Sequence, residues 1–177
     1  RALRPGGVLQ LATYSSIGVA SWHGAARALA RRLLPSVFGD DGGLARQPSS
    51  AEMRLVREHV RRMSIEGTAL YSAAAAHLVQ MTEFYSSTGL RDLLFHPCET
   101  TFTLLEMETL LADAGLRPVG VYFRSLEADS RARTAFRSRF GDGIDPEQRE
   151  LSRWHELEVA DPALFGRMHV VFAQRVI

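Results

Sequence analysis

Two groups of side chains in the sequence have types and spacing that could support chemistry. His96 and Glu99 place an imidazole three residues from a carboxylate, a pair that could remove a proton from an acceptor hydroxyl or amine. Tyr14 and Ser15 end an apolar run, and open α/β sheets bind their ligands at such strand ends. The alternatives are a structural histidine beside a loop carboxylate, and ordinary polar residues at a strand end. The sequence leaves both alternatives open.

A third pair, Arg91 and Asp92, could orient a substrate carboxylate, or the two side chains could simply pair at the surface. Metal binding is not expected, because His96, Cys98 and Glu99 crowd into one loop without a second cluster of ligands.

Length and composition describe an ordinary globular chain. Its 177 residues, 46% hydrophobic and 23% charged, suit one domain with a sizeable core. The net charge of +1 gives no field that would attract nucleic acid or an anionic membrane, and no apolar run could span a bilayer. A single cysteine fits a reducing cytoplasm. We therefore expect a cytoplasmic protein that binds neither nucleic acid nor membrane, and whose arginine sets are solvated helix faces: Arg27, Arg31 and Arg32, and Arg54, Arg57, Arg61 and Arg62.

Apolar segments predict three strands, over residues 8–14, 118–123 and 168–174. Helical patterns separate the first two. Apolar spacing predicts an amphipathic helix from Ser21 to Leu34, and after a glycine-rich loop a capping box at Ser49–Glu52 predicts a helix to about Met63. An alanine-rich helix over residues 70–80 follows a break at Gly67.

In the second half of the chain, helix caps mark where the predicted helices begin and end. Thr103 and Glu106 form another capping box, which opens a helix that ends at Gly115. A polar stretch then leads to a helix from Asp145 to about Val159, and Asp161-Pro162 begins a shorter one.

The order of these elements resembles the C-terminal half of class I S-adenosylmethionine-dependent methyltransferases. It begins with Leu3-Arg4-Pro5-Gly6-Gly7 before a strand, and it includes a capped helix ending in Ala114-Gly115-Leu116 and a closing strand. A narrower resemblance lies in Arg91-Asp92-Leu93-Leu94-Phe95-His96 with Glu99 and Phe102-Thr103, which is similar to bacterial methyltransferases often fused to tetratricopeptide repeats. Thr100 stands where that pattern commonly has histidine.

The resemblance implies an α/β fold, the C-terminal part of a Rossmann-like seven-stranded methyltransferase sheet. The three strands would be its fifth, sixth and seventh, with the last two as an antiparallel edge hairpin, and residues 20–98 would be a helical insertion that caps the acceptor site. The whole chain, 1–177, would be one partial domain.

Site residues follow from the same resemblance. His96 and Glu99 would be catalytic, and the substrate-binding residues would be Tyr14, Ser15, Arg91 and Asp92. The family's glycine-rich turn is absent from the sequence. S-adenosylmethionine would therefore bind mainly to a missing N-terminal half, and this fragment would be inactive alone. The methyl acceptor, a protein or a small molecule, is not identified by the sequence.

The rival interpretation is a non-catalytic helical binding or scaffold module with a self-contained core. A methyltransferase fragment would instead expose an unpaired apolar strand edge, through which it could self-associate.

Overall fold

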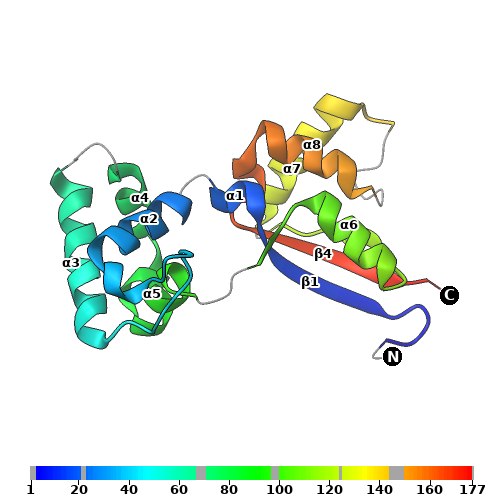
Figure 1. Ribbon diagram of the computed structural model, residues 1–177. Helices are drawn as coiled ribbons and strands as arrows, with labels where there is room; N and C mark the ends of the chain where they lie inside the picture. The colour runs from blue at the N-terminus through cyan, green and yellow to red at the C-terminus, as the bar shows by residue number, and fades with distance from the viewer. Residues whose placement is uncertain are drawn as a thin grey trace. The chain divides into compact units, whose positions relative to one another are not determined.

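The computed structural model describes residues 3–20, 23–66, 71–96, 100–123, 125–143 and 150–176. These residues form eight α-helices, three short 3₁₀ helices and four strands. The chain divides into two compact units, one formed by Arg1–Val19 with Thr100–Ile177 and the other by Ala20–Glu99 (Figure 1). We call them the sheet unit and the helical unit.

The sheet unit contains the strands β1 (Val8–Ser15), β2 (Thr101–Phe102), β3 (Leu116–Val121) and β4 (Met168–Arg175). Their order across the sheet is β2-β1-β4-β3. β4 is antiparallel to both neighbours, so β1 and β3 run in the same direction on either side of it. The expected strands at both ends of the chain are thus confirmed as neighbours in one sheet, and the expected pairing of the last two is confirmed as well.

The sheet has one strand more than the three that the sequence predicts for this chain. Four strands are present among the described residues, and the fourth, β2, pairs in parallel with Tyr14 and Ser15 at the end of β1. β3 begins two residues before the expected segment and carries a register shift between Pro118 and Gly120, the pattern of a β-bulge. Pro118 is tolerated because β3 lies at the edge of this sheet.

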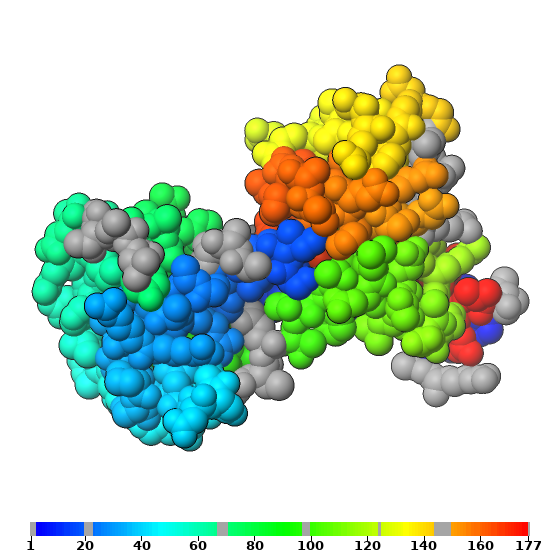
Figure 2. Space-filling model, turned by 45° about the horizontal axis from the view of Figure 1, so that its top comes forward, coloured from blue at the N-terminus to red at the C-terminus, as the bar shows by residue number. Residues whose placement is uncertain are grey.

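Three helices cover one face of the sheet: α6 (Leu104–Asp113), α7 (Leu126–Phe140) and α8 (Leu151–Ala160) (Figure 1). Atoms of α8 lie between those of α7 and α6 (Figure 2). Their buried side chains, with Trp154 and Phe136 in ring contact at 4.6 Å, pack on the inward residues of β4, Val171 and Ala173. Burial of this large apolar surface is the main stabilising term of the unit.

The opposite face of the sheet has no helix over it in the described part of the chain. Residues alternate along β1, so that Val8, Gln10 and Ala12 are exposed while Leu9 and Leu11 point to the covered side. Val8 is 55% exposed, and Tyr122, which meets the ring of Phe172 edge-on at 6.4 Å, is 52% exposed.

β1 also has an open edge. No strand in the described ranges pairs with its outer side along Val8–Thr13, because β2 reaches only its last two residues. The sheet unit therefore presents both an unpaired edge and a partly apolar face.

The helical unit packs around a core of its own, to which Phe84, Met53 and Leu94 contribute. Its elements are α2 (His23–Leu33), η1 (Pro35–Val37), α3 (Ser50–Glu66), α4 (Ser72–Leu78), η2 (Thr82–Tyr85) and α5 (Ser87–Leu94). The expected capping box of α3 is confirmed, since Glu52 N–H donates to Ser49 Oγ at 3.2 Å and Ser49 N–H donates to Glu52 Oε2 at 2.8 Å.

Two further differences from the sequence-based expectations concern helices. The sequence predicted only a polar stretch after the second expected strand, and this prediction is wrong. The stretch contains α7, which is capped by Ser125 and buries Ala132 and Phe136. A short helix, α1 (Ser16–Ala20), follows β1 directly. The expected cap at Ser21, the break at Gly67 and the helix start at Asp145-Pro146 lie outside the described residues.

Candidate functional site

The carboxyl end of β1 is the candidate site, because two parallel strands, β1 and β2, end side by side there. Tyr14 is paired in register with Thr101, and Ser15 with Phe102. Tyr14 also lies opposite Met168 of the antiparallel strand β4. Parallel strand ends at which the chain turns into a helix are the usual ligand-binding edge of open α/β sheets.

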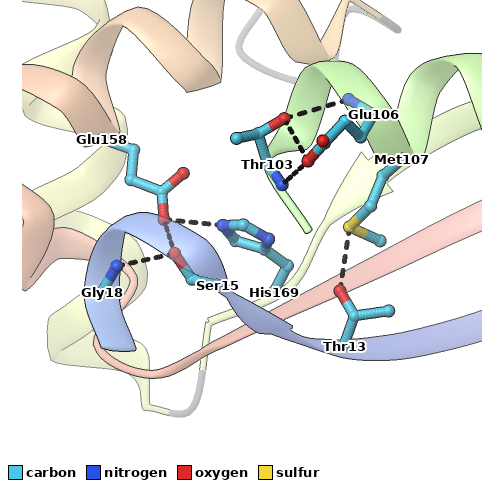
Figure 3. Close-up of polar contacts among 8 residues, drawn as sticks. All are labelled: Thr13, Ser15, Gly18, Thr103, Glu106, Met107, Glu158 and His169. Atoms are coloured by element: carbon cyan, nitrogen blue, oxygen red, sulfur yellow. Dashed lines mark hydrogen bonds and ion pairs between the residues drawn. The ribbon is translucent and has the colours of Figure 1, made fainter. Parts of the chain in front are cut away.

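Ser15 sits at the turn from strand to helix. Its Oγ accepts a hydrogen bond from the N–H of Gly18 at 2.8 Å, which is the geometry of a helix N-cap for α1. The same hydroxyl donates to Oε1 of Glu158, which reaches it from α8 (Figure 3). Ser15 thus joins the end of the strand to a helix that covers the sheet.

His169 of β4 completes the cluster. Its Nε2 lies 2.7 Å from the same Oε1 of Glu158 that Ser15 contacts (Figure 3). In the tautomer with its proton on Nε2, the imidazole donates a hydrogen bond to this carboxylate oxygen. One carboxylate oxygen therefore holds a strand end, a neighbouring strand and a helix together.

All three side chains of this Ser15–Glu158–His169 cluster are fully buried. In serine hydrolases the imidazole lies between the hydroxyl and the acid, whereas here the carboxylate occupies the middle position. Ser15 therefore has no imidazole to take its proton, and its side chain is fully buried. The cluster positions the end of β1, and it does not supply a nucleophile.

Two polar atoms of the cluster, Glu158 Oε2 and His169 Nδ1, are buried without a hydrogen-bond partner among the described residues. A buried polar group without a partner lowers stability, because it has lost its hydration without replacement.

The turn after Ser15 depends on a close approach of two glycines. A Cβ on Gly18 would collide with the carbonyl oxygen of Gly166, which itself has a φ of +64°. Glycine is required at position 18 by this contact and is favoured at 166 by its left-handed backbone. The backbone around the site is therefore fixed by packing as well as by the buried carboxylate.

α6 is held beside β1 by a second set of contacts. Thr103 and Glu106 form the expected capping box, which the structure confirms, and Thr13 Oγ1 donates to Met107 Sδ at 3.1 Å (Figure 3). Hydrogen bonds from the Thr103 backbone and hydroxyl lower the pKa of the Glu106 carboxyl below its ordinary value. Glu106 is therefore ionised at neutral pH and stabilises the helix start.

The other expected site residues belong to the helical unit. Arg91 and Asp92 are exposed on α5, and no hydrogen bond or ion pair joins their side chains to each other. His96 is half-buried, and its carbonyl oxygen accepts from Arg27 Nη2 at 3.4 Å. Glu99, its expected catalytic partner, and Cys98 lie outside the described residues. The catalytic and substrate-binding roles expected for these residues stay predictions.

Within the described ranges, no group of three histidine, cysteine or carboxylate side chains is arranged to hold a metal ion. None of the helices there combines the length and apolar character needed to cross a membrane. The strand-to-helix turn after β1 is filled by the contact of Gly18 with Gly166, so this turn does not fit a nucleotide cofactor.

Glu158 and His169 were not predicted from the sequence to be members of the cluster. A signal for each was present. Glu158 follows Trp154 by four residues and Leu151 by seven, which places a carboxylate on the apolar face of a helix. His169 alternates with Val171 and Ala173 on the inward side of its strand. A buried acid and a buried imidazole from adjacent elements are expected to find each other.

Comparison with known proteins shows a similarity in fold. No protein-family model matches the sequence, and no curated protein does. The solved structure of PKMT2, a protein lysine methyltransferase from Rickettsia typhi, matches with a TM-score of 0.51 at 10% sequence identity. The match covers 97% of this chain and 29% of PKMT2, so the chain spans less than a third of that protein's length. The chain thus has a methyltransferase-like fold.

Proposed function

We propose that this chain is the C-terminal portion of an S-adenosylmethionine-dependent methyltransferase, and that it forms part of the sheet and the acceptor-side cap. The similarity in fold to PKMT2 over 97% of the chain carries the proposal. The sheet order supports it, because the last two strands, β3 and β4, pair in an antiparallel manner at one edge of the sheet, as the family resemblance implies.

The cofactor site belongs to the part of the enzyme beyond these residues. The chain has no glycine-rich turn of the dinucleotide type, and its turn after β1 is closed by glycine packing. The match to 29% of PKMT2 is consistent with an enzyme of which this chain is one part. The helical unit would then cover the methyl acceptor, with Arg91, Asp92 and His96 as the first residues to test.

A second candidate is a non-catalytic helical binding module. The observation that favours it is the separate core of the helical unit, which buries its own apolar side chains. A unit with a core of its own can act as a binding surface without any chemistry.

Calorimetry with S-adenosylmethionine separates the two candidates. The 177-residue chain is compared with the protein extended upstream to its natural start, with adenosine as the control ligand. Binding by the extended protein alone is the expected result, and it would direct attention to the acceptor. If neither protein binds, the methyltransferase proposal fails and the binding module is favoured.

A further inference from the structure

One face of α3 forms a positively charged pocket. Arg54, Arg57 and Arg61 recur at intervals of three and four residues, which brings them to the same side of the helix. With Glu58 they line a cavity of about 320 Å³. The sequence suggested a solvated face here, and for Arg57 that expectation is wrong.

Arg57 is partly buried, and its side chain is held by a hydrogen bond to the backbone of η2. Its Nε donates to the carbonyl oxygen of Phe84 at 3.0 Å, whereas its Nη2 is buried with no hydrogen-bond partner in the described part of the chain. A guanidinium presents its donors as a planar fork that matches the two oxygens of a carboxylate or phosphate. Because Nη2 is buried, an oxyanion in the cavity would be attracted by the charge of this guanidinium and not by a hydrogen bond to Nη2.

Arg61 is also held in place. Its guanidinium carbon lies 5.3 Å from the centre of the Tyr85 ring, within the range of a cation–π contact. The ring is itself anchored, since Tyr85 Oη donates to the carbonyl oxygen of Val79 at 2.7 Å. Arginine side chains that are already ordered lose less entropy when they bind a ligand.

The charges around the cavity leave it positive. Glu58 is the one carboxylate among the described residues that line it, and Glu58 Oε1 lies 3.3 Å from Arg62 Nη2, on the neighbouring turn of the helix. Glu83 of η2 accepts a hydrogen bond from Thr82 Oγ1 at 3.1 Å. The lining of the cavity therefore has three guanidinium groups and one carboxylate. The charge of that carboxylate is partly neutralised by Arg62. The volume of the cavity is at the small end of the range for ligand pockets, about 300–1,000 Å³, so the cavity suits a single charged group of a ligand.

We propose that the pocket lined by Arg54, Arg57 and Arg61 binds an oxyanion, the carboxylate or phosphate group of a ligand. The site lies wholly in the helical unit. It does not depend on the proposed methyl transfer.

Calorimetry at low ionic strength tests the proposal on the 177-residue chain, in a buffer free of oxyanions. Inorganic phosphate and an end-blocked hexaglutamate peptide are the two probes. Arg54→Gln and Arg61→Gln are the variants, because Arg57 also supports the backbone of η2. Arg32→Gln is the matched control, since Arg32 is an exposed arginine of α2 and its loss changes the net charge equally.

Each pocket variant is expected to weaken binding at least about tenfold, the low end for losing a hydrogen bond between charged groups. Arg32→Gln should change it less than about twofold, because screening weakens distant charges. Glu58→Gln should tighten binding. Phosphate binding alone would indicate a phosphate ligand, and tighter peptide binding would indicate acidic side chains. The proposal is overturned if neither probe binds, or if the pocket variants bind as Arg32→Gln does.

Discussion

At the scale of single residues, the carboxylate of Glu158 organises the candidate site. Its Oε1 accepts from Ser15 and from His169, and Ser15 also caps α1 through the N–H of Gly18. Without the Ser15 hydroxyl, the carboxyl group of Glu158 loses one hydrogen-bond donor. The N–H of Gly18 loses this hydroxyl as an acceptor. A buried polar group that loses a hydrogen-bond partner lowers stability.

We expect Ser15→Ala to lower the free energy of unfolding by about 1–3 kcal/mol, the cost of leaving a buried polar group unsatisfied. Urea denaturation followed by circular dichroism measures it. Ser138→Ala is the matched control, because Ser138 is exposed on α7 and should change stability by less than about 0.5 kcal/mol. Equal effects of the two substitutions would show that the cluster does not stabilise the fold.

The sequence pointed to one member of this cluster and not to the others. Ser15 was identifiable because strand ends bind ligands, but its burial and its bond to Glu158 depend on tertiary packing. Glu158 lies 143 residues away in the chain. No local pattern links two residues at that separation, so the cluster could be found only from the fold.

At the scale of elements, helix caps were predicted well because they are local. Both capping boxes, at Ser49–Glu52 and Thr103–Glu106, are formed as the sequence indicated. α7 was missed because its arginines obscure a narrow apolar face made by Ala132 and Phe136. The Ser125 cap before it was the local signal that could have identified it.

The cap of α3 makes a prediction about pH. A hydrogen bond from Arg46, followed by bonds from Ser49, lowers the pKa of the Glu52 carboxyl to about 2. Because the pKa is depressed on folding, the contribution of Glu52 is fully present above its unfolded value of about 4.3 and is lost as the pH falls through about 2.

Glu52→Gln should therefore destabilise the protein at neutral pH, and its difference from the wild type should shrink between about pH 4.3 and about pH 2. Glu66→Gln, at the exposed far end of the same helix, is the control. Unfolding curves across this pH range provide the measurement. A constant difference would mean that the ion pair with Arg46 does not carry the effect.

At the scale of the whole molecule, the sheet is incomplete on one side. β1 has an unpaired edge along Val8–Thr13, and the face that carries Val8, Phe172 and Tyr122 has no covering helix in the described residues. An exposed edge strand beside apolar side chains is a template for pairing with another chain. If the proposed function is correct, the preceding part of the enzyme covers this surface, and without it the chain should self-associate.

Sedimentation velocity over a range of concentrations tests this expectation with Val8→Lys. The 177-residue chain should form dimers or larger species, and the lysine should shift them toward monomer, because a charge beside the open edge opposes pairing. Val159→Lys is the matched control, since Val159 is 59% exposed on α8 and Val8 is 55% exposed on β1. The edge is the site of association only if Val8→Lys shifts the protein toward monomer and Val159→Lys does not. A chain that stays monomeric at every concentration would show that the sheet is complete as it stands, which favours the binding module over the methyltransferase portion.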